Sequence, residues 1–154
     1  MSYPSALQEL IDFFEGLSEG ERRENLIGLA ENASSFRPEP GESFDLTDVR
    51  KDQGCTDTVG LFLRVEAGGR VHFAVELGPK VQTLTRAMTT LLCRGLNGAT
   101  LEEVLEISPD FVPRLIGEEL VRLRSQTVYY VLSRMKQAAA EARRGERSFL
   151  TDET

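Results

Sequence analysis

Cys55 is the residue of this chain whose type and position are best suited to chemistry. It follows Gly54, ends a long unpatterned segment and directly precedes the first alternating strand. A glycine before a cysteine permits a tight bend and leaves room for another molecule to approach the sulfur, and loops usually present reactive groups. A thiolate there could attack the outer sulfur of a persulfide. The competing interpretation is a buried core thiol, because free cysteines are often buried, and both stay open on these residues alone.

Charged residues near Cys55 in the sequence would act on its thiol in opposite directions. Arg50 and Lys51 would favour the thiolate, whereas Asp52 and Asp57 would oppose it. The sequence does not say which pair lies closer to the sulfur.

Three other residues carry groups that react or bind in many proteins. Cys93 lies in an apolar run of a helical pattern, which predicts a core or half-buried thiol. His72 lies on the more polar face of a predicted strand, where a lone histidine is most often a surface residue. Arg124 is expected at the surface with a packed stem. The pattern alone assigns none of the three a role.

Composition narrows the class of protein. The chain has 154 residues, so we expect one domain over 1–154, with a core at about 5–142 and a polar, frayed tail over 143–154. A net charge of −7 disfavours nucleic acids and anionic membrane surfaces as partners. No apolar run is long enough for a transmembrane span, and the N-terminus lacks the pattern of a secretory signal.

Two cysteines and one histidine limit the metal and disulfide chemistry. A disulfide framework is not expected, and a reducing, cytoplasmic compartment is the simpler interpretation. A zinc site usually takes four closely spaced Cys/His ligands, which are missing, so we expect no metal. Gly68-Gly69 is part of a turn and lacks the pattern of a nucleotide-binding loop, so we expect no cofactor.

The elements around Cys55 follow from hydrophobic spacing. Two helices are predicted at the start, the second opened by a capping box from Ser18 to Glu21. The pattern is then lost from residue 32 to about 58, except for a short strand near 44–49. Alternation over 59–65 and 71–77, with glycines between, predicts an antiparallel hairpin.

The remainder is predicted to be helical. A helix runs from near Pro79 to about 97, a capping box covers 100–103, and Ser108-Pro109 is a cap followed by proline. A long last helix places one stripe of residues on its buried side: Leu120, Leu123, Thr127, Val128, Val131 and Met135. The fold class is therefore α+β, a small antiparallel sheet packed by helices on one face.

These pieces together resemble the SufE family of sulfur acceptors, which assist cysteine desulfurases. The resemblance covers about residues 7–139 and depends on the order of several stretches: Gly54-Cys55, the hairpin, 96–98, 100–105, 108–111 and 124–126. It implies a three-stranded antiparallel sheet with helices, of the SufE/IscU-like type. Unlike the related scaffolds, this chain has only one cysteine placed to act.

The resemblance assigns roles to particular residues. The family acceptor cysteine follows a glycine, which places the acceptor role on Cys55. Asp57 and Gly60 stand where the family usually has serine and tryptophan. Arg124 is the one match to a Ser-Pro-Ser-Arg stretch, and it is expected near the cysteine loop, in contact with the partner or the persulfide.

The function implied is a persulfide relay with no independent turnover expected. Cys55 takes sulfur from a cysteine desulfurase of the SufS/CsdA-like type, stimulates that enzyme and passes sulfur to an iron–sulfur scaffold. The altered residues at Asp57 and Gly60 motivate an alternative, a module that binds the desulfurase without accepting sulfur. A redox-sensing thiol is a third option, weakened by the lack of a nearby resolving cysteine. At rest, Cys55 is expected at a loop tip, its sulfur against apolar neighbours.

Overall fold

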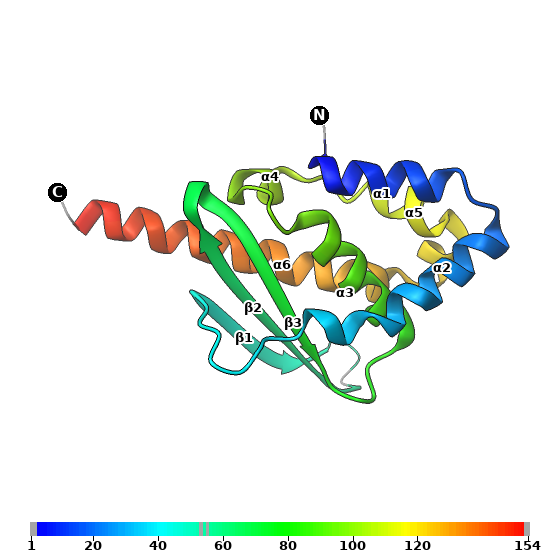
Figure 1. The fold of residues 1–154 in the computed structure, drawn as a ribbon, viewed down its shortest axis with the longest axis horizontal. Helices are drawn as coiled ribbons and strands as arrows, with labels where there is room; N and C mark the ends of the chain where they lie inside the picture. Colours follow the sequence, from blue (N-terminus) through cyan, green and yellow to red (C-terminus); the bar gives the residue numbers. More distant parts are fainter. Residues whose placement is uncertain (1–2, 53, 55, 153–154) are drawn as a thin grey trace.

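The computed structural model describes residues 3–52, 54 and 56–152, with side chains described up to residue 145. Three strands and a set of helices follow one another along the chain (Figure 1). The elements are α1 Ser5–Glu15, α2 Glu19–Glu31, the short 3₁₀ helix η1 Ala33–Phe36, β1 Leu46–Lys51, β2 Thr58–Glu66, the 3₁₀ turn η2 Ala67–Gly69, β3 Arg70–Leu77, α3 Thr83–Leu96, α4 Leu101–Glu106, α5 Phe111–Ile116 and α6 Glu118–Asp152.

The sheet is antiparallel in the order β1-β2-β3, which confirms the predicted α+β class. Val49 of β1 lies opposite Gly60 of β2, and Leu61 lies opposite Val75 of β3. The turn between β2 and β3 contains Gly68, at a φ of 81° that favours glycine. The expected hairpin is therefore present, with the glycine where the turn needs it.

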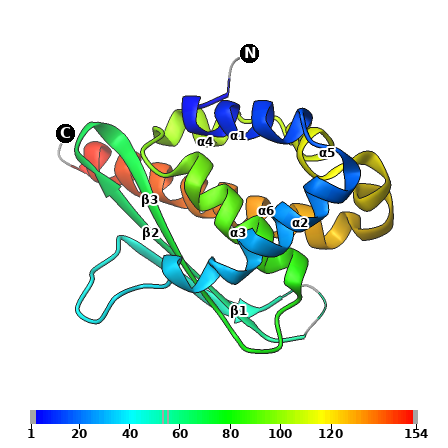
Figure 2. The same ribbon diagram turned by 45° about the vertical axis from the view of Figure 1, so that its right-hand side comes forward.

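The core lies between the sheet and the helices. Alternate residues of β2 and β3 are buried on the inner face: Val59, Leu61, Leu63, Val71, Phe73 and Val75. The helices gather on one side of the sheet, with α3 and α6 packed against it (Figure 2). The apolar residues at every second position of the two strands therefore all lie on one face of the sheet, which is buried.

The segment before β1, which shows no pattern in the sequence, crosses the outer face of the sheet. The rings of Phe44 and Phe62 lie 5.3 Å apart, and Arg64 Nη1 lies 2.7 Å from Glu42 Oε2. The strand expected near 44–49 begins two residues later, at Leu46. Side-chain contacts thus tie this long connection to the sheet.

Both predicted capping boxes are present. The backbone N–H of Glu21 donates to Ser18 Oγ, and the N–H of Ser18 donates to Glu21 Oε1. Thr100 and Glu103 make the same reciprocal pair at the start of α4. Local sequence signals therefore set these two helix starts.

Two predicted details of the helices are wrong. α5 begins at Phe111 with Asp110 at its N-cap, so the helix starts after Ser108-Pro109. Helix α6 bends at Arg124, whose φ of −132° and ψ of 35° are not helical, and Leu123 just before the bend is 67% exposed. Helix α6 continues beyond residue 143 and ends at Asp152. Within the described part of the chain, no helix is long and apolar enough to cross a membrane.

Candidate functional site

The candidate site is the loop between β1 and β2, where Cys55 stands in the sequence. Cys55 lies outside the residues that the structure describes, and so does its expected place at a loop tip. On either side, the backbone N–H of Asp52 donates to the carbonyl of Asp57 at 2.9 Å. Asp52 Oδ1 accepts from the N–H of Thr56 at 2.7 Å. These bonds close the base of the loop immediately after the strand ends.

Asp57 fixes the far end of this loop to another part of the chain. Its Oδ1 accepts from the N–H of Thr58 at 2.8 Å, and its Oδ2 accepts from the N–H of Lys80 at 2.7 Å. These two bonds, helped by the charges of Lys80 and Arg86, hold the pKa of the Asp57 carboxyl below its usual range. The carboxylate therefore remains ionised and ties the loop to the connection between β3 and α3.

Gly78 makes that contact possible. A Cβ atom at position 78 would lie 2.3 Å from Asp57 Cγ, far inside van der Waals contact. Arg86 Nη2 donates to the Gly78 carbonyl at 2.6 Å, and the Gly78 N–H donates to the Thr58 carbonyl at 2.9 Å. The loop thus packs against the connection between β3 and α3, and Arg86 of α3 holds that connection in place.

A small cavity of about 130 Å³ lies beside the loop. Its lining is mostly polar and comes from three places, the loop, the start of α3 and the part of α6 after the bend: Asp52, Gly54, Thr56, Gln82, Thr85, Gln126, Thr127 and Tyr130. The site is therefore a loop set between two helices.

The structure brings some of the predicted site residues together. Gly54 and Asp57 lie in the loop, on either side of position 55. Arg50 donates to Gln137 of α6 at 2.8 Å and pairs with Asp48 at 3.2 Å. Arg50 is thus engaged with α6, and both of the acidic residues that could oppose a thiolate accept backbone hydrogen bonds in the loop.

Lys51 and Arg124 have exposed side chains. The Lys51 carbonyl accepts a hydrogen bond from the Tyr130 hydroxyl at 3.3 Å. Arg124 stands at the bend of α6, two residues before Gln126, which lines the cavity. Within the described part of the chain, its guanidinium makes no hydrogen bond or ion pair, so its predicted contact with partner or persulfide stays a prediction.

The other cysteine has the expected place in the core. Cys93 is fully buried on α3, and burial raises the pKa of its thiol to about 12. A thiol in this state is a poor nucleophile at neutral pH. His72 lies on the outer sheet face, with Nε2 3.6 Å from Glu42 Oε2, as expected for a surface residue.

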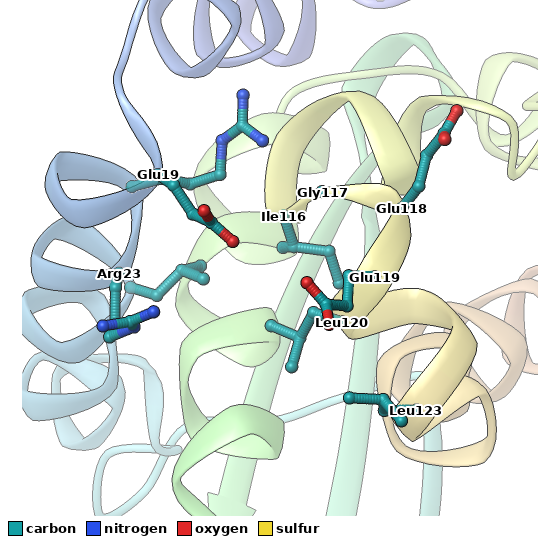
Figure 3. A pocket seen from close by; sticks show the side chains of 10 residues that line it. Glu19, Arg23, Ile116, Gly117, Glu118, Glu119, Leu120 and Leu123 are labelled. Atoms are coloured by element: carbon teal, nitrogen blue, oxygen red, sulfur yellow. The ribbon is translucent and has the colours of Figure 1, made fainter.

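A larger hollow of about 480 Å³ lies elsewhere, between α2 and the start of α6 (Figure 3). Its labelled side chains include the carboxylates of Glu19, Glu118 and Glu119 and the apolar Leu120 and Leu123. Among the described residues that line it there is no cysteine and no residue of the predicted site.

No group of three or more His, Cys, Asp and Glu residues among the described side chains could hold a metal ion.

Sequence reasoning missed two residues on the α6 side of the loop. Tyr130 lines the cavity and binds the Lys51 carbonyl, and Arg134 one turn later is buried. The sequence does contain a sign of the buried arginine. Arg134 lies three residues after Val131 and four before Ala138, a spacing that places it on the buried face of α6.

Known proteins share both sequence and fold with this chain. Residues 8–139 match the family described as "SufE: Fe-S metabolism associated domain". The chain is 26% identical over 138 residues to "SufE-like protein 1, chloroplastic/mitochondrial" of Arabidopsis thaliana, with 88% of this chain and 35% of that protein covered. The chain thus spans about a third of the length of that curated relative.

Two solved structures resemble the fold. A hypothetical protein from Thermus thermophilus, solved in solution, has a TM-score of 0.70 at 24% identity, covering 92% of this chain and 98% of that one. The N-terminal part of a nitrogen-fixing NifU-like protein from Brucella abortus has a TM-score of 0.54 at 18% identity, covering 79% and 94%. At these identities the similarity concerns the fold alone.

Proposed function

This chain belongs to the SufE family of Fe–S metabolism associated domains, and on that premise we propose that it accepts persulfide sulfur on Cys55 from a cysteine desulfurase. The accepted sulfur then passes to a scaffold on which iron–sulfur clusters are assembled. The chain acts as a carrier and as an activator of the desulfurase, without turnover of its own. The small number of cysteines supports a reducing, cytoplasmic setting for this reaction.

The transfer is a thiol–disulfide type exchange. The Cys55 thiolate attacks the outer sulfur of the desulfurase persulfide, Cys–S–SH. A sulfur–sulfur bond forms to Cys55 as the bond within the desulfurase persulfide breaks, and the desulfurase cysteine leaves as a thiolate. One sulfur atom moves with no net oxidation, so the step needs no further reactant.

The observation that carries the proposal is that position 55 lies in a loop closed at its base and fixed at its far end. The Asp52–Asp57 backbone bond joins the two ends, and the Asp57 carboxylate binds the Lys80 N–H. The described residues on both sides of position 55 are therefore held in place before a partner arrives, and such preorganisation lowers the entropic cost of a transfer step. Cys93 cannot take this part, because its thiol is buried.

The alternative function, a desulfurase-binding module that accepts no sulfur, depends on the unusual residues Asp57 and Gly60. Each has a structural role in this chain. Asp57 anchors the loop, and Gly60 is buried where a Cβ would lie 3.1 Å from the ring of Phe62 and 3.4 Å from Val49. Because both changes are explained by packing and hydrogen bonding within the chain, we favour the acceptor.

Mass spectrometry of the intact protein tests the proposal. The wild type, incubated with a cysteine desulfurase and cysteine, should gain the mass of sulfur, and Cys55→Ser should gain none. No gain on the wild type, or an equal gain on the variant, would reject the acceptor function. Stimulation of the desulfurase that persists fully in Cys55→Ala, without sulfur on the wild type, would support the binding module.

A further inference from the structure

Arg134 of α6 carries a charge into the protein core. Its side chain is 2% exposed, and it is the one charged residue in the described part of the chain that is nearly fully buried. Burying a guanidinium is costly unless hydrogen bonds satisfy it. Its partners therefore indicate what the arginine is for.

Those partners come from both strands that lead into the Cys55 loop. Nε donates to Asp48 Oδ2 at 3.2 Å, and Nη2 donates to the Asp48 carbonyl at 2.6 Å and to the Val59 carbonyl at 3.1 Å. Asp48 lies three residues before the end of β1, and Val59 is the second residue of β2. One planar guanidinium thus joins the middle of β1 to the beginning of β2.

Tyr130 extends this contact to the last residue before the loop. Its hydroxyl accepts from Arg134 Nη1 at 2.6 Å and donates to the Lys51 carbonyl at 3.3 Å. Lys51 ends β1, and Tyr130 lines the cavity together with Gly54 and Thr56. The hydrogen-bond chain Arg134–Tyr130–Lys51 therefore links α6 to the start of the loop.

We infer that Arg134 is a positioning residue for sulfur transfer, which holds the strand residues on either side of the Cys55 loop in place relative to α6. This inference rests on the proposed function. The antiparallel ladder already pairs β1 with β2, but it does not fix the two strands against the helix. Gln126 and Thr127, which also line the cavity, belong to that helix. Without Arg134, the two strands and these helix residues can shift against each other.

Two substitutions test the inference, and they disturb the hydrogen-bond network to different extents. Arg134→Lys keeps the charge, but one ammonium cannot reach the carbonyls of both strands and the Tyr130 hydroxyl in the same geometry. Tyr130→Phe keeps the ring and removes the hydroxyl, and with it both the link to Lys51 and the acceptor for Arg134 Nη1. Met135→Ala, at a fully buried neighbour on the same helix, is the control, because it weakens packing without touching these hydrogen bonds.

Each variant is tested in single-turnover sulfur transfer from a persulfide-loaded cysteine desulfurase at increasing desulfurase concentrations. The second readout is alkylation of Cys55 by iodoacetamide, in which the thiolate forms a carbon–sulfur bond and iodide leaves. We expect the limiting transfer rate of Arg134→Lys to fall roughly tenfold, because small misplacements of reacting atoms are costly. Tyr130→Phe should fall less. The half-saturating desulfurase concentration and the alkylation rate should not decrease.

The outcomes separate this inference from the proposed function. If the wild type receives no sulfur, the proposed function fails and the inference fails with it. If the wild type receives sulfur while Arg134→Lys and Met135→Ala transfer equally fast, only the positioning role of Arg134 is rejected. A parallel fall in transfer and alkylation also rejects it, because the thiol itself would then be affected.

Discussion

The carboxylate of Asp57 and the backbone N–H of Lys80 are joined by a hydrogen bond of 2.7 Å, which ties the loop containing Cys55 to the connection after β3. The same carboxylate accepts the N–H of Thr58 with its other oxygen. A residue that departs from the usual family sequence thus supplies the main anchor of the loop.

Asp57→Asn should loosen the far end of the loop. Asparagine offers one acceptor oxygen, and its amide group would face a second backbone N–H donor. We therefore expect faster hydrogen exchange at the Thr58 and Lys80 amides and a lower midpoint of thermal unfolding at neutral pH. Exchange rates equal to those of the wild type at both amides would contradict this role.

The effect of Asp57→Asn should depend on pH in a defined direction. Folding lowers the pKa of the Asp57 carboxyl, so its stabilising contribution is complete above the ordinary pKa and is lost as the pH falls through the lowered value. The difference in unfolding midpoint between wild type and Asp57→Asn should therefore shrink below about pH 3.9. A difference that grows in acid would show that the carboxylate has the opposite effect.

Gly78→Ala should lower the free energy of unfolding by about 1–3 kcal/mol, because the new methyl group would overlap the Asp57 carboxyl. In an Asp57→Ala background the same change should cost less by at least about 0.5 kcal/mol, since the overlap is gone. Urea unfolding of the four proteins measures this coupling. Gly20→Ala is the matched control, because a Cβ there meets nothing within 4 Å. Strictly additive costs would contradict the close contact.

Cys93 should neither accept sulfur nor react with alkylating reagents in the folded protein. Its buried thiol, with the pKa raised to about 12, should resist iodoacetamide at pH 8 until the protein is unfolded. Cys93→Ala should lower the free energy of unfolding by about 1 kcal/mol and leave sulfur acceptance unchanged. Alkylation of both thiols at equal rates in the folded protein would contradict the assignment.

Features with a local cause were predictable from the sequence. The hairpin follows from alternation and Gly68, and the capping boxes follow from residues three apart. The burial of Cys93 follows from its apolar run on one helix. In each of these cases the determining residues are close together in the chain.

Contacts between distant segments were not predictable in this way. Asp57 in the loop before β2 accepts a hydrogen bond from Lys80 in the connection after β3, and Arg134 reaches Asp48 and Val59 from the last helix. No periodicity encodes such pairs, because they depend on how helices pack on the sheet. The exposure of Leu123 was not predictable from spacing either. Its position fits the apolar stripe of the last helix, but the bend at Arg124 leaves its side chain exposed.

The most direct measurement follows sulfur on a protein with one remaining cysteine. In a Cys93→Ser background, peptide mass spectrometry after incubation with a cysteine desulfurase and cysteine should locate one or more added sulfur atoms on the peptide containing Cys55. Further replacement of Cys55 by serine should abolish the gain. A Cys93→Ser protein that folds, binds the desulfurase and carries no added sulfur at Cys55 would contradict the acceptor function.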